Sequence, residues 1–342
     1  MGIVGGRNLG EAYFGQSSAS NFADMDVLAA GTLVTQMSAS FDRYWNHALA
    51  YPVRTLISPA ELDTLLQGTR SSSEREMVEA VQRADSAQTG QTGQDSSMPA
   101  PMQLAQAHWV WAPGALLVDW PAKFDSQQSG AAELTVIGGL IDLMQEARNE
   151  VLIVSPYFVP GPLMMKAFAD LRKRDVRVRV LTNSLAASDA PLAHIGYARW
   201  RKRLLELGVE LYEMRSERRK SLRSALGSMG KSQHASLHAK GIVIDRTVLG
   251  VGSMNLDMRS HFSNSEIALL VHSPLLAQTV SQQMEEVMTD AAWRVTLSTQ
   301  GFLQWRTHDG KEPAINRAEP DASIPLQLLL KIAAPFAPDA LL

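Results

Sequence analysis

The sequence predicts an α/β fold, because apolar strand patterns and amphipathic helix patterns alternate along its second half. The clearest run is strand, helix, strand, helix, strand between Val151 and Met214, a spacing typical of a mostly parallel sheet covered by helices. The 342 residues, of which 45% are apolar, are enough for two domains with sizeable cores.

The expected elements follow the chain in order. Residues 24–31 predict a short strand, and apolar side chains at every fourth position of 33–45 predict a helix. Apolar residues alternate over 108–124 around a Pro-Gly turn. The run then continues with a helix over 135–150, a strand over 151–161, a helix over 162–175, a strand over 176–184, a helix over 194–208 closed by Gly208, and a strand over 209–214.

Two segments about 240 residues apart resemble one another. Each has a glycine turn, an asparagine, an acidic residue that opens a strand, and then a helix, so that Asn8 corresponds to Asn255 and Asp26 to Glu266. An internal duplication is the economical interpretation. We therefore expect 1–67 to be the remainder of a first lobe, 68–107 a flexible linker or insert, and 108–342 a second lobe.

Five polar residues cluster on one predicted hairpin. His238 and Lys240 are two positions apart on a predicted strand over 236–244, so both point to one face. A lysine is a fixed charge for a phosphate oxygen, and a histidine attacks phosphorus or passes a proton near neutral pH. Asp245 could orient an imidazole, either that of His238 or that of a histidine in the opposing copy. The returning strand carries Ser253 and Asn255, which can donate hydrogen bonds to anionic oxygens.

Each of these residues alone would be ordinary in a strand or turn, but the joint pattern indicates phosphate-ester chemistry without a metal or cofactor. His-x-Lys-x4-Asp-x6-Gly-Ser-x-Asn over 238–255 resembles the signature of the phospholipase D superfamily. The segments 155–161, 182–215, 236–240 and 252–260 are most similar to the bacterial cardiolipin synthase branch, in particular its third-type, phospholipase D-like proteins. Gly241 and Met254 depart from the residues frequent at those positions, which are a threonine and an aromatic residue.

The resemblance implies a bilobal phospholipase D-like fold in which two His-Lys-Asp copies meet at one site. In this family the first-copy histidine typically forms a phosphohistidine, and the second protonates the leaving group and later activates the acceptor alcohol. Carried over to this sequence, the roles are His238 as acid and base, Lys240 as phosphate clamp, Asp245 as orienting residue, Ser253, Asn255 and Asn8 as donors to the phosphate, Glu266 and Asp26 as partners of the histidines, and His194, Tyr157 and Tyr197 as lining residues.

The first-copy motif is the main departure. None of the other seven histidines is followed two residues later by lysine, so the first lobe is expected to be incomplete, as in a chain truncated at its N-terminus. We expect weak or absent activity for the chain alone. Three hypotheses follow: a cardiolipin synthase-like enzyme that joins phosphatidylglycerol to a second phospholipid, a non-catalytic remnant or half-site partner subunit, and a phosphodiesterase on another substrate such as nucleic acid.

The expected partners are phospholipids and a membrane surface, with a separate N-terminal fragment as a further candidate. Nucleic acid is disfavoured, because the net charge is −3 and aromatic residues interleave only weakly with basic ones outside 197–203; one local basic patch lies at 217–231. There is no cysteine, no run long enough to span a bilayer and no leader pattern, so we expect a protein in the cytoplasm or peripheral on the inner membrane. Tyr157, Phe158 and Trp200 are candidate contacts with the bilayer.

Overall fold

The computed structural model describes residues 1–15, 17, 20–67, 107–124, 135–217, 234–307 and 315–337. The chain forms two compact units. One consists of Met1–Ser40 and His108–Leu342, and the other of Phe41–Ala107. Of the expected linker, 68–107, only residue 107 is among the described residues. Of the basic segment, 217–231, only residue 217 is described. The division into two lobes and a linker therefore stays a prediction.

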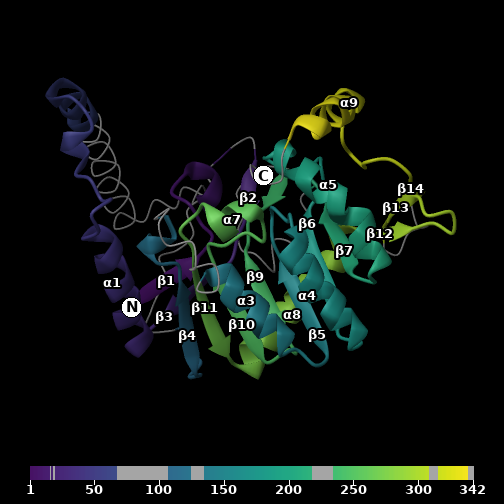
Figure 1. The fold of residues 1–342 in the computed structure, drawn as a ribbon, viewed down its shortest axis with the longest axis horizontal. Helices are drawn as coiled ribbons and strands as arrows, with labels where there is room; N and C mark the ends of the chain where they lie inside the picture. Colours follow the sequence, from purple (N-terminus) through teal and green to yellow (C-terminus); the bar gives the residue numbers. More distant parts are fainter. Residues whose placement is uncertain are drawn as a thin grey trace, which may run out of the picture. The chain divides into compact units, whose positions relative to one another are not determined.

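Within the described residues of the first unit, ten strands form one mixed sheet in the order β14-β13-β12-β7-β6-β5-β9-β10-β11-β4 (Figure 1). The strands β5, β6 and β7 pair in parallel, and the other neighbours in this sheet are antiparallel. The bounds are β4 Gly114–Val118, β5 Glu150–Val154, β6 Arg177–Asn183, β7 Glu210–Met214, β9 Gly241–Ile244, β10 Val248–Gly252, β11 Ile267–His272, β12 Ala292–Leu297, β13 Leu303–Arg306 and β14 Ile315–Asn316. The expected α/β class is confirmed, and the sheet, expected to be mixed or mostly parallel, is mixed, with parallel pairing only among β5, β6 and β7 of its described strands.

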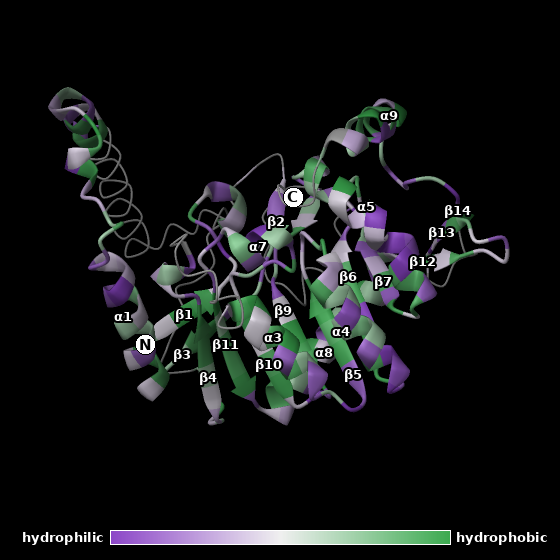
Figure 2. Cartoon of the chain, in the orientation of Figure 1, coloured by the Kyte–Doolittle hydropathy of each residue, from purple (hydrophilic) through white to green (hydrophobic). Residues whose placement is uncertain are grey.

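Helices cover both faces of this sheet. The helices α3 (Val136–Gln145), α4 (Gly161–Lys173) and α5 (Pro191–Glu206) pack on one face, and α8 (Pro274–Asp290) packs on the other (Figure 1). Strand β5 shows why both faces need cover, since Val151 and Ile153 enter the core under α3 and α4 while Leu152 and Val154 enter the core under α8. Figure 2 shows the same hydrophobic character along β10 and β11.

Two short sheets bring the start of the chain to the second half. Strand β1 (Gly2–Gly5) pairs antiparallel with β3 (Asp26–Ala29), and β2 (Asn21–Ala23) pairs in parallel with β8 (Ala235–Leu237). The two segments that suggested a duplication have similar layouts. A glycine turn follows β1 in the first and β10 in the second. Strand β1 pairs antiparallel with β3, which begins at Asp26, and β10 pairs antiparallel with β11, which follows Glu266.

The remaining described elements are helices and 3-10 turns. They are the helices α1 (Thr32–Trp45), α7 (Met258–Phe262) and α9 (Ile324–Ala333), and the 3-10 turns Glu11–Phe14, Val53–Thr55, Pro121–Phe124 and Ala334–Phe336. No helix in the described part of the chain combines the length and the apolar character needed to cross a bilayer.

The strand expected over 236–244 is interrupted at its centre. Strand β8 ends at Leu237 and β9 begins at Gly241, so the motif residues lie in the connection between them. The backbone N–H groups of His238 and Ala239 both donate to the carbonyl of Ala23, at 2.8 and 3.0 Å, which ends the regular ladder. The site residues therefore stand at a strand end, beside the N-terminal segment.

Candidate active site

His238 is a buried side chain held by residues from the start of the chain. Its Nδ1 lies 2.8 Å from Oδ2 of Asp24, whose side chain has no exposed surface. The rings of Tyr13 and Phe22 pack against the imidazole with centroid separations of 4.9 and 5.2 Å. A proton on Nδ1 shared with a buried carboxylate orients the ring and leaves Nε2 for proton transfer or attack on phosphorus.

Lys240 lies against the same imidazole. Its Nζ is 3.0 Å from Nδ1 and 3.1 Å from Nε2 of His238, and it donates to the carbonyl of His238 at 2.7 Å. Burial lowers the pKa of Lys240 to about 8, and the attraction of Asp24 and other carboxylates opposes that shift only in part. The structure thus brings together the imidazole and the ammonium that the sequence placed on one face.

The glycine turn after β1 completes this wall of the site. A Cβ added at Gly6 would lie 2.8 Å from Cδ of Lys240 and 3.2 Å from the carbonyl oxygen of His238. Only a residue without a side chain lets the backbone approach so closely. The glycine turn near the N-terminus and the His-x-Lys segment therefore form one packed unit.

Asp245 does not orient His238, which corrects one of the two expectations for it; a role toward a histidine of an opposing copy stays a prediction. Its carboxylate accepts the backbone N–H groups of Arg148, Asn149 and Glu150 at 2.7 to 2.9 Å. Asp245 has a φ of 50° and Arg246 a φ of 53°, as in a tight hairpin turn between β9 and β10. Asp245 stabilises the turn at the far end of β9, and Asp24 occupies the orienting position instead.

Glu266 does not contact a histidine within the described residues. Its carboxylate accepts hydrogen bonds from the Ser253 hydroxyl at 2.5 Å and from the Ser260 hydroxyl at 2.8 Å. The Ser253 oxygen also accepts the N–H of Ile267 at 3.1 Å. The hydroxyl proton of Ser253, expected to donate to a phosphate oxygen, is therefore directed to Glu266.

The two asparagines expected to bind phosphate differ in their surroundings. The Asn255 N–H donates to the Ser260 hydroxyl at 3.1 Å, while its buried Oδ1 has no hydrogen-bond partner among the described residues. The Asn8 amide is exposed and donates to the hydroxyl of Tyr13 at 3.1 Å, and Tyr13 packs against His238. Asn8 is thus connected to the imidazole through Tyr13.

Asp26, expected to be a partner of a histidine, binds Arg7 instead. The Arg7 Nε lies 2.6 Å from Oδ2 of Asp26 on β3. Asp24, which was not singled out in the sequence, lies two residues earlier, in the connection between β2 and β3, and its carboxylate contacts His238. The signal that could have found it is the pair of aspartates in Ala-Asp-Met-Asp, which offers two carboxylates where the comparison of the two halves used one.

Of the three expected lining residues, Tyr157 lies beside the loop that carries Ser253 and Asn255. The Tyr157 hydroxyl donates to both oxygens of Asp189 at 2.8 Å, and burial together with the charge of Asp189 raises the pKa of Tyr157. The neighbouring residue Phe158 forms a β-bridge with Leu256, which places Tyr157 beside the loop that carries Ser253 and Asn255.

His194 and Tyr197 belong to a different cluster inside α5, which corrects the expectation for both. The Tyr197 hydroxyl donates to buried Glu213 at 3.0 Å, and Nε2 of His194 lies 2.9 Å from a guanidinium nitrogen of Arg201. Arg201 also lies 3.0 Å from Glu213 and 2.7 Å from Glu319. These groups satisfy one another in the interior, because a buried arginine needs carboxylate partners.

Four carboxylates favour the charged form of the Lys240 ammonium and so oppose the effect of its burial. Asp24, Glu266, Asp189 and Asp257 all act on Lys240. Burial raises the pKa of Asp257 to about 6, although its carboxylate caps α7 through the N–H of Ser260 at 2.7 Å. No cluster of three or more acidic or histidine side chains in the described ranges has the arrangement of a metal site. The chemistry that this arrangement offers is phosphate binding by Lys240 and proton transfer by His238.

A mixed sheet that carries this imidazole–ammonium pair defines a phospholipase D-like protein, a class of enzymes. A family model described as cardiolipin synthase, PLD-like domain, matches residues 140–288. Cardiolipin synthase C of Escherichia coli (strain K12) is 32% identical over 97% of this chain and 68% of its own length. An uncharacterized protein of Helicobacter pylori is 27% identical over 96% of this chain and 62% of its own length. The chain belongs to the cardiolipin synthase branch of the phospholipase D superfamily.

A solved structure supports the fold. Phosphatidylserine synthase of Haemophilus influenzae Rd KW20 superimposes with a TM-score of 0.55 at 16% identity, and the match covers 98% of this chain and 66% of that one. The chain therefore spans about two thirds of the length of the relatives it matches.

Proposed function

We propose that the chain takes part in phosphatidyl transfer between phospholipids, as in cardiolipin synthesis from phosphatidylglycerol and a second phospholipid. The contact of His238 with Asp24, beside Lys240, is the observation that carries this proposal. The names of two relatives, cardiolipin synthase C and phosphatidylserine synthase, support phospholipids as the substrate class.

The proposed chemistry assigns a role to each of these side chains. Lys240 Nζ binds an oxygen of the phosphodiester, and Nε2 of His238 gives a proton to the leaving alcohol as the old phosphorus–oxygen bond breaks. A histidine from a second His-x-Lys half-site accepts phosphorus and holds the phosphatidyl group as a phosphohistidine. His238 then removes the proton of the acceptor alcohol, whose oxygen forms the new bond to phosphorus and releases the second histidine.

A half-site role is the second candidate, and the balance of charge favours it. The sequence contains one His-x-Lys pair, and four carboxylates already act electrostatically on its ammonium. An anionic phosphodiester would be repelled by those carboxylates unless further positive charge faced it. A second His-x-Lys from another polypeptide supplies such charge, so we expect an impaired rate for the chain alone and a higher rate with that partner.

The experiment that tests the proposal is a vesicle assay with the purified chain. Vesicles of phosphatidylglycerol, alone or with a zwitterionic phospholipid, are incubated with the chain, and cardiolipin is measured by mass spectrometry. A second series adds a polypeptide that carries the first His-x-Lys-x4-Asp motif of a relative, and a third replaces lipid with single-stranded DNA.

We expect cardiolipin from the chain with the added polypeptide and a loss of at least about 100-fold in His238→Ala. The exposed His272 offers a matched control, and His272→Ala should behave as the unaltered chain. An equal amount of cardiolipin from His238→Ala would contradict the proposal. Cleavage of DNA that depends on His238, without lipid turnover, would show that the substrate is nucleic acid and not phospholipid.

A further inference from the structure

The helix α9, Ile324–Ala333, has apolar residues on two sides, and only one side is covered by the described residues of the protein. Leu330 is buried against Leu185 and Ile195, and Leu326 and Ala333 pack on the same small cluster. These contacts attach α9 to α5 and leave the opposite side of the helix outside the core.

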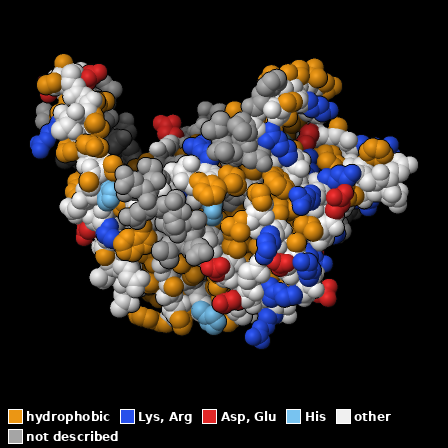
Figure 3. Space-filling model, viewed as in Figure 1, with side chains coloured by type: hydrophobic (Ala, Val, Ile, Leu, Met, Phe, Trp, Pro, Cys, Tyr) orange, Lys and Arg blue, Asp and Glu red, His pale blue; other side chains and the backbone are white. Residues whose placement is uncertain are grey.

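The uncovered side is strongly apolar. Ile324 is 80% exposed, Leu328 58%, Leu329 61% and Ile332 61%. Ile324, Leu328 and Ile332 recur at intervals of four residues, so they share one face of the helix. Figure 3 shows a hydrophobic patch over α9 with Lys and Arg side chains beside it. An exposed apolar patch with a polar border is typical of an interaction surface.

The helix is held firmly in this orientation. The N–H of Leu326 donates to the Ser323 hydroxyl, which caps the helix, and Nε2 of Gln327 donates to the carbonyls of Glu319 and Ala322 at 3.1 and 2.9 Å. At the other end, the Arg199 guanidinium donates to the carbonyls of Ala334 and Ala337. The apolar face is therefore part of a fixed surface.

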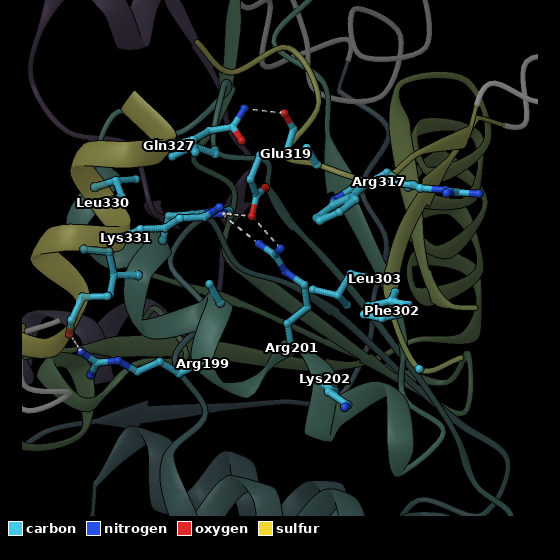
Figure 4. A pocket seen from close by; sticks show the side chains of 18 of the residues that line it. Arg199, Arg201, Lys202, Phe302, Leu303, Arg317, Glu319, Gln327, Leu330 and Lys331 are labelled. Atoms are coloured by element: carbon cyan, nitrogen blue, oxygen red, sulfur yellow. Dashed lines mark hydrogen bonds and ion pairs between the residues drawn. The ribbon is translucent and has the colours of Figure 1, made fainter. Parts of the chain in front are cut away.

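A cavity of about 720 Å³ opens between α5 and α9, and cations border it (Figure 4). Its lining includes five basic side chains and one carboxylate, Glu319. Arg201 neutralises that carboxylate at 2.7 Å and Lys202 pairs with Glu206 at 3.9 Å, so the excess of positive charge comes from Arg317 and Lys331. Neither Arg317 nor Lys331 forms an ion pair within the described part of the chain.

We propose that the outer face of α9 and the basic side chains beside it dock the chain on the surface of an anionic phospholipid bilayer. The ten residues of α9 extend about 15 Å, half the thickness of the hydrocarbon core, so the helix lies in the plane of the interface. The exposed leucines and isoleucines enter the boundary between headgroups and acyl chains, and the cations bind lipid phosphates. The choice of a lipid partner rests on the proposed function.

This surface differs from the aromatic contacts expected in the sequence. Phe158 is buried in the main core with 1% of its surface exposed, and Tyr157 is bonded to Asp189 beside the active site. Neither side chain offers the exposed area that α9 does. The bilayer contact is therefore assigned to the C-terminal helix instead.

The test is sedimentation of the full chain with vesicles of phosphatidylglycerol mixed with phosphatidylcholine, and with vesicles of phosphatidylcholine alone. The double variant Leu328→Ser with Ile332→Ser removes two exposed apolar side chains and should weaken binding at least about tenfold. The matched control is Leu275→Ser on α8, because Leu275 is 63% exposed and should bind as the unaltered chain does. Circular dichroism and thermal unfolding check that each variant is folded.

Charge is tested separately. Arg317→Gln with Lys331→Gln should weaken binding to phosphatidylglycerol vesicles about 25-fold, or about fivefold per charge, and leave binding to phosphatidylcholine unchanged. The variant His238→Ala should bind vesicles normally, so a failure of the proposed catalysis is distinguishable from a failure of docking. Unchanged vesicle binding by the folded α9 variant would overturn the proposal. A loss of self-association in that variant would also overturn it, because the outer face of α9 would then bind a second copy of the chain.

Discussion

The buried ammonium of Lys240 lowers the free energy of unfolding by an amount that depends on pH. Its ammonium is buried, and burial lowers its pKa from 10.5 to about 8. A group whose pKa is depressed on folding contributes stability above its unfolded pKa and loses that contribution as the pH falls through its folded value. The protein should therefore become more stable, as far as Lys240 is concerned, when the pH rises from 8 toward 10.5.

The magnitude follows from the size of the shift. A pKa that moves from 10.5 to about 8 corresponds to about 3 kcal/mol between the two protonation states. The variant Lys240→Met keeps an unbranched apolar side chain but has no proton to lose. The free energy of unfolding of the unaltered chain, minus that of the variant, should thus increase by about 3 kcal/mol between pH 7 and pH 10.5.

The assay is denaturant unfolding of both proteins, followed by circular dichroism at several pH values in that range. Using the difference between the two proteins cancels the titration of every group they share. Lys173→Met is the matched control, because the Lys173 side chain is 76% exposed and its removal should give a difference that does not change with pH. A constant difference for Lys240→Met as well would refute the argument that burial depresses the pKa of Lys240.

Four other changes have defined outcomes. The transfer rate should fall as the pH rises above about 8, because Lys240 then loses the charge that binds phosphate; a pH–rate profile measures this. Asp24→Asn should lower kcat by a factor of about 100 or more with little change in KM, since it removes the carboxylate that orients the imidazole 2.8 Å away; steady-state kinetics on vesicles decide. Asp245→Ser should lower the free energy of unfolding by about 1 to 3 kcal/mol and leave the rate per folded molecule within about threefold, because its carboxylate holds three backbone N–H groups; a large loss of rate with normal stability would restore the orienting role. Arg201→Leu should destabilise the chain by about 3 to 5 kcal/mol in chemical unfolding, because the carboxylate of Glu213 then stays buried without its partner, and Glu213→Leu added to it should recover part of the loss.

The fold was most predictable where each element was long and regular. The helices α3, α4 and α5 and the strands between them follow clear periods of 3.6 and 2, and each lies within a few residues of its expected position. The region after α8 was not predicted. There β13 and β14 are short edge strands of four and two residues, and α9 is apolar on nearly all sides, so neither period stands out.

The site was predictable only as far as local sequence determines it. His238 and Lys240 are neighbours along the chain, so their proximity followed from strand geometry. The partner of His238 lies 214 residues away, and matching the two halves of the chain pointed to Asp26, which opens a strand, rather than to Asp24. Asp245 was misassigned because a motif position does not reveal whether a carboxylate faces a ligand or the backbone of its own turn.

The central claim is that His238 and Lys240 converge on one phosphate. The most direct measurement is an NMR titration of the chain, labelled with nitrogen-15 in its histidines, with inorganic phosphate. We predict that the imidazole signal assigned to His238 by the His238→Ala variant shifts, and that the shift is lost in Lys240→Met. A shift confined to other histidines, or one that persists without Lys240, would contradict the account.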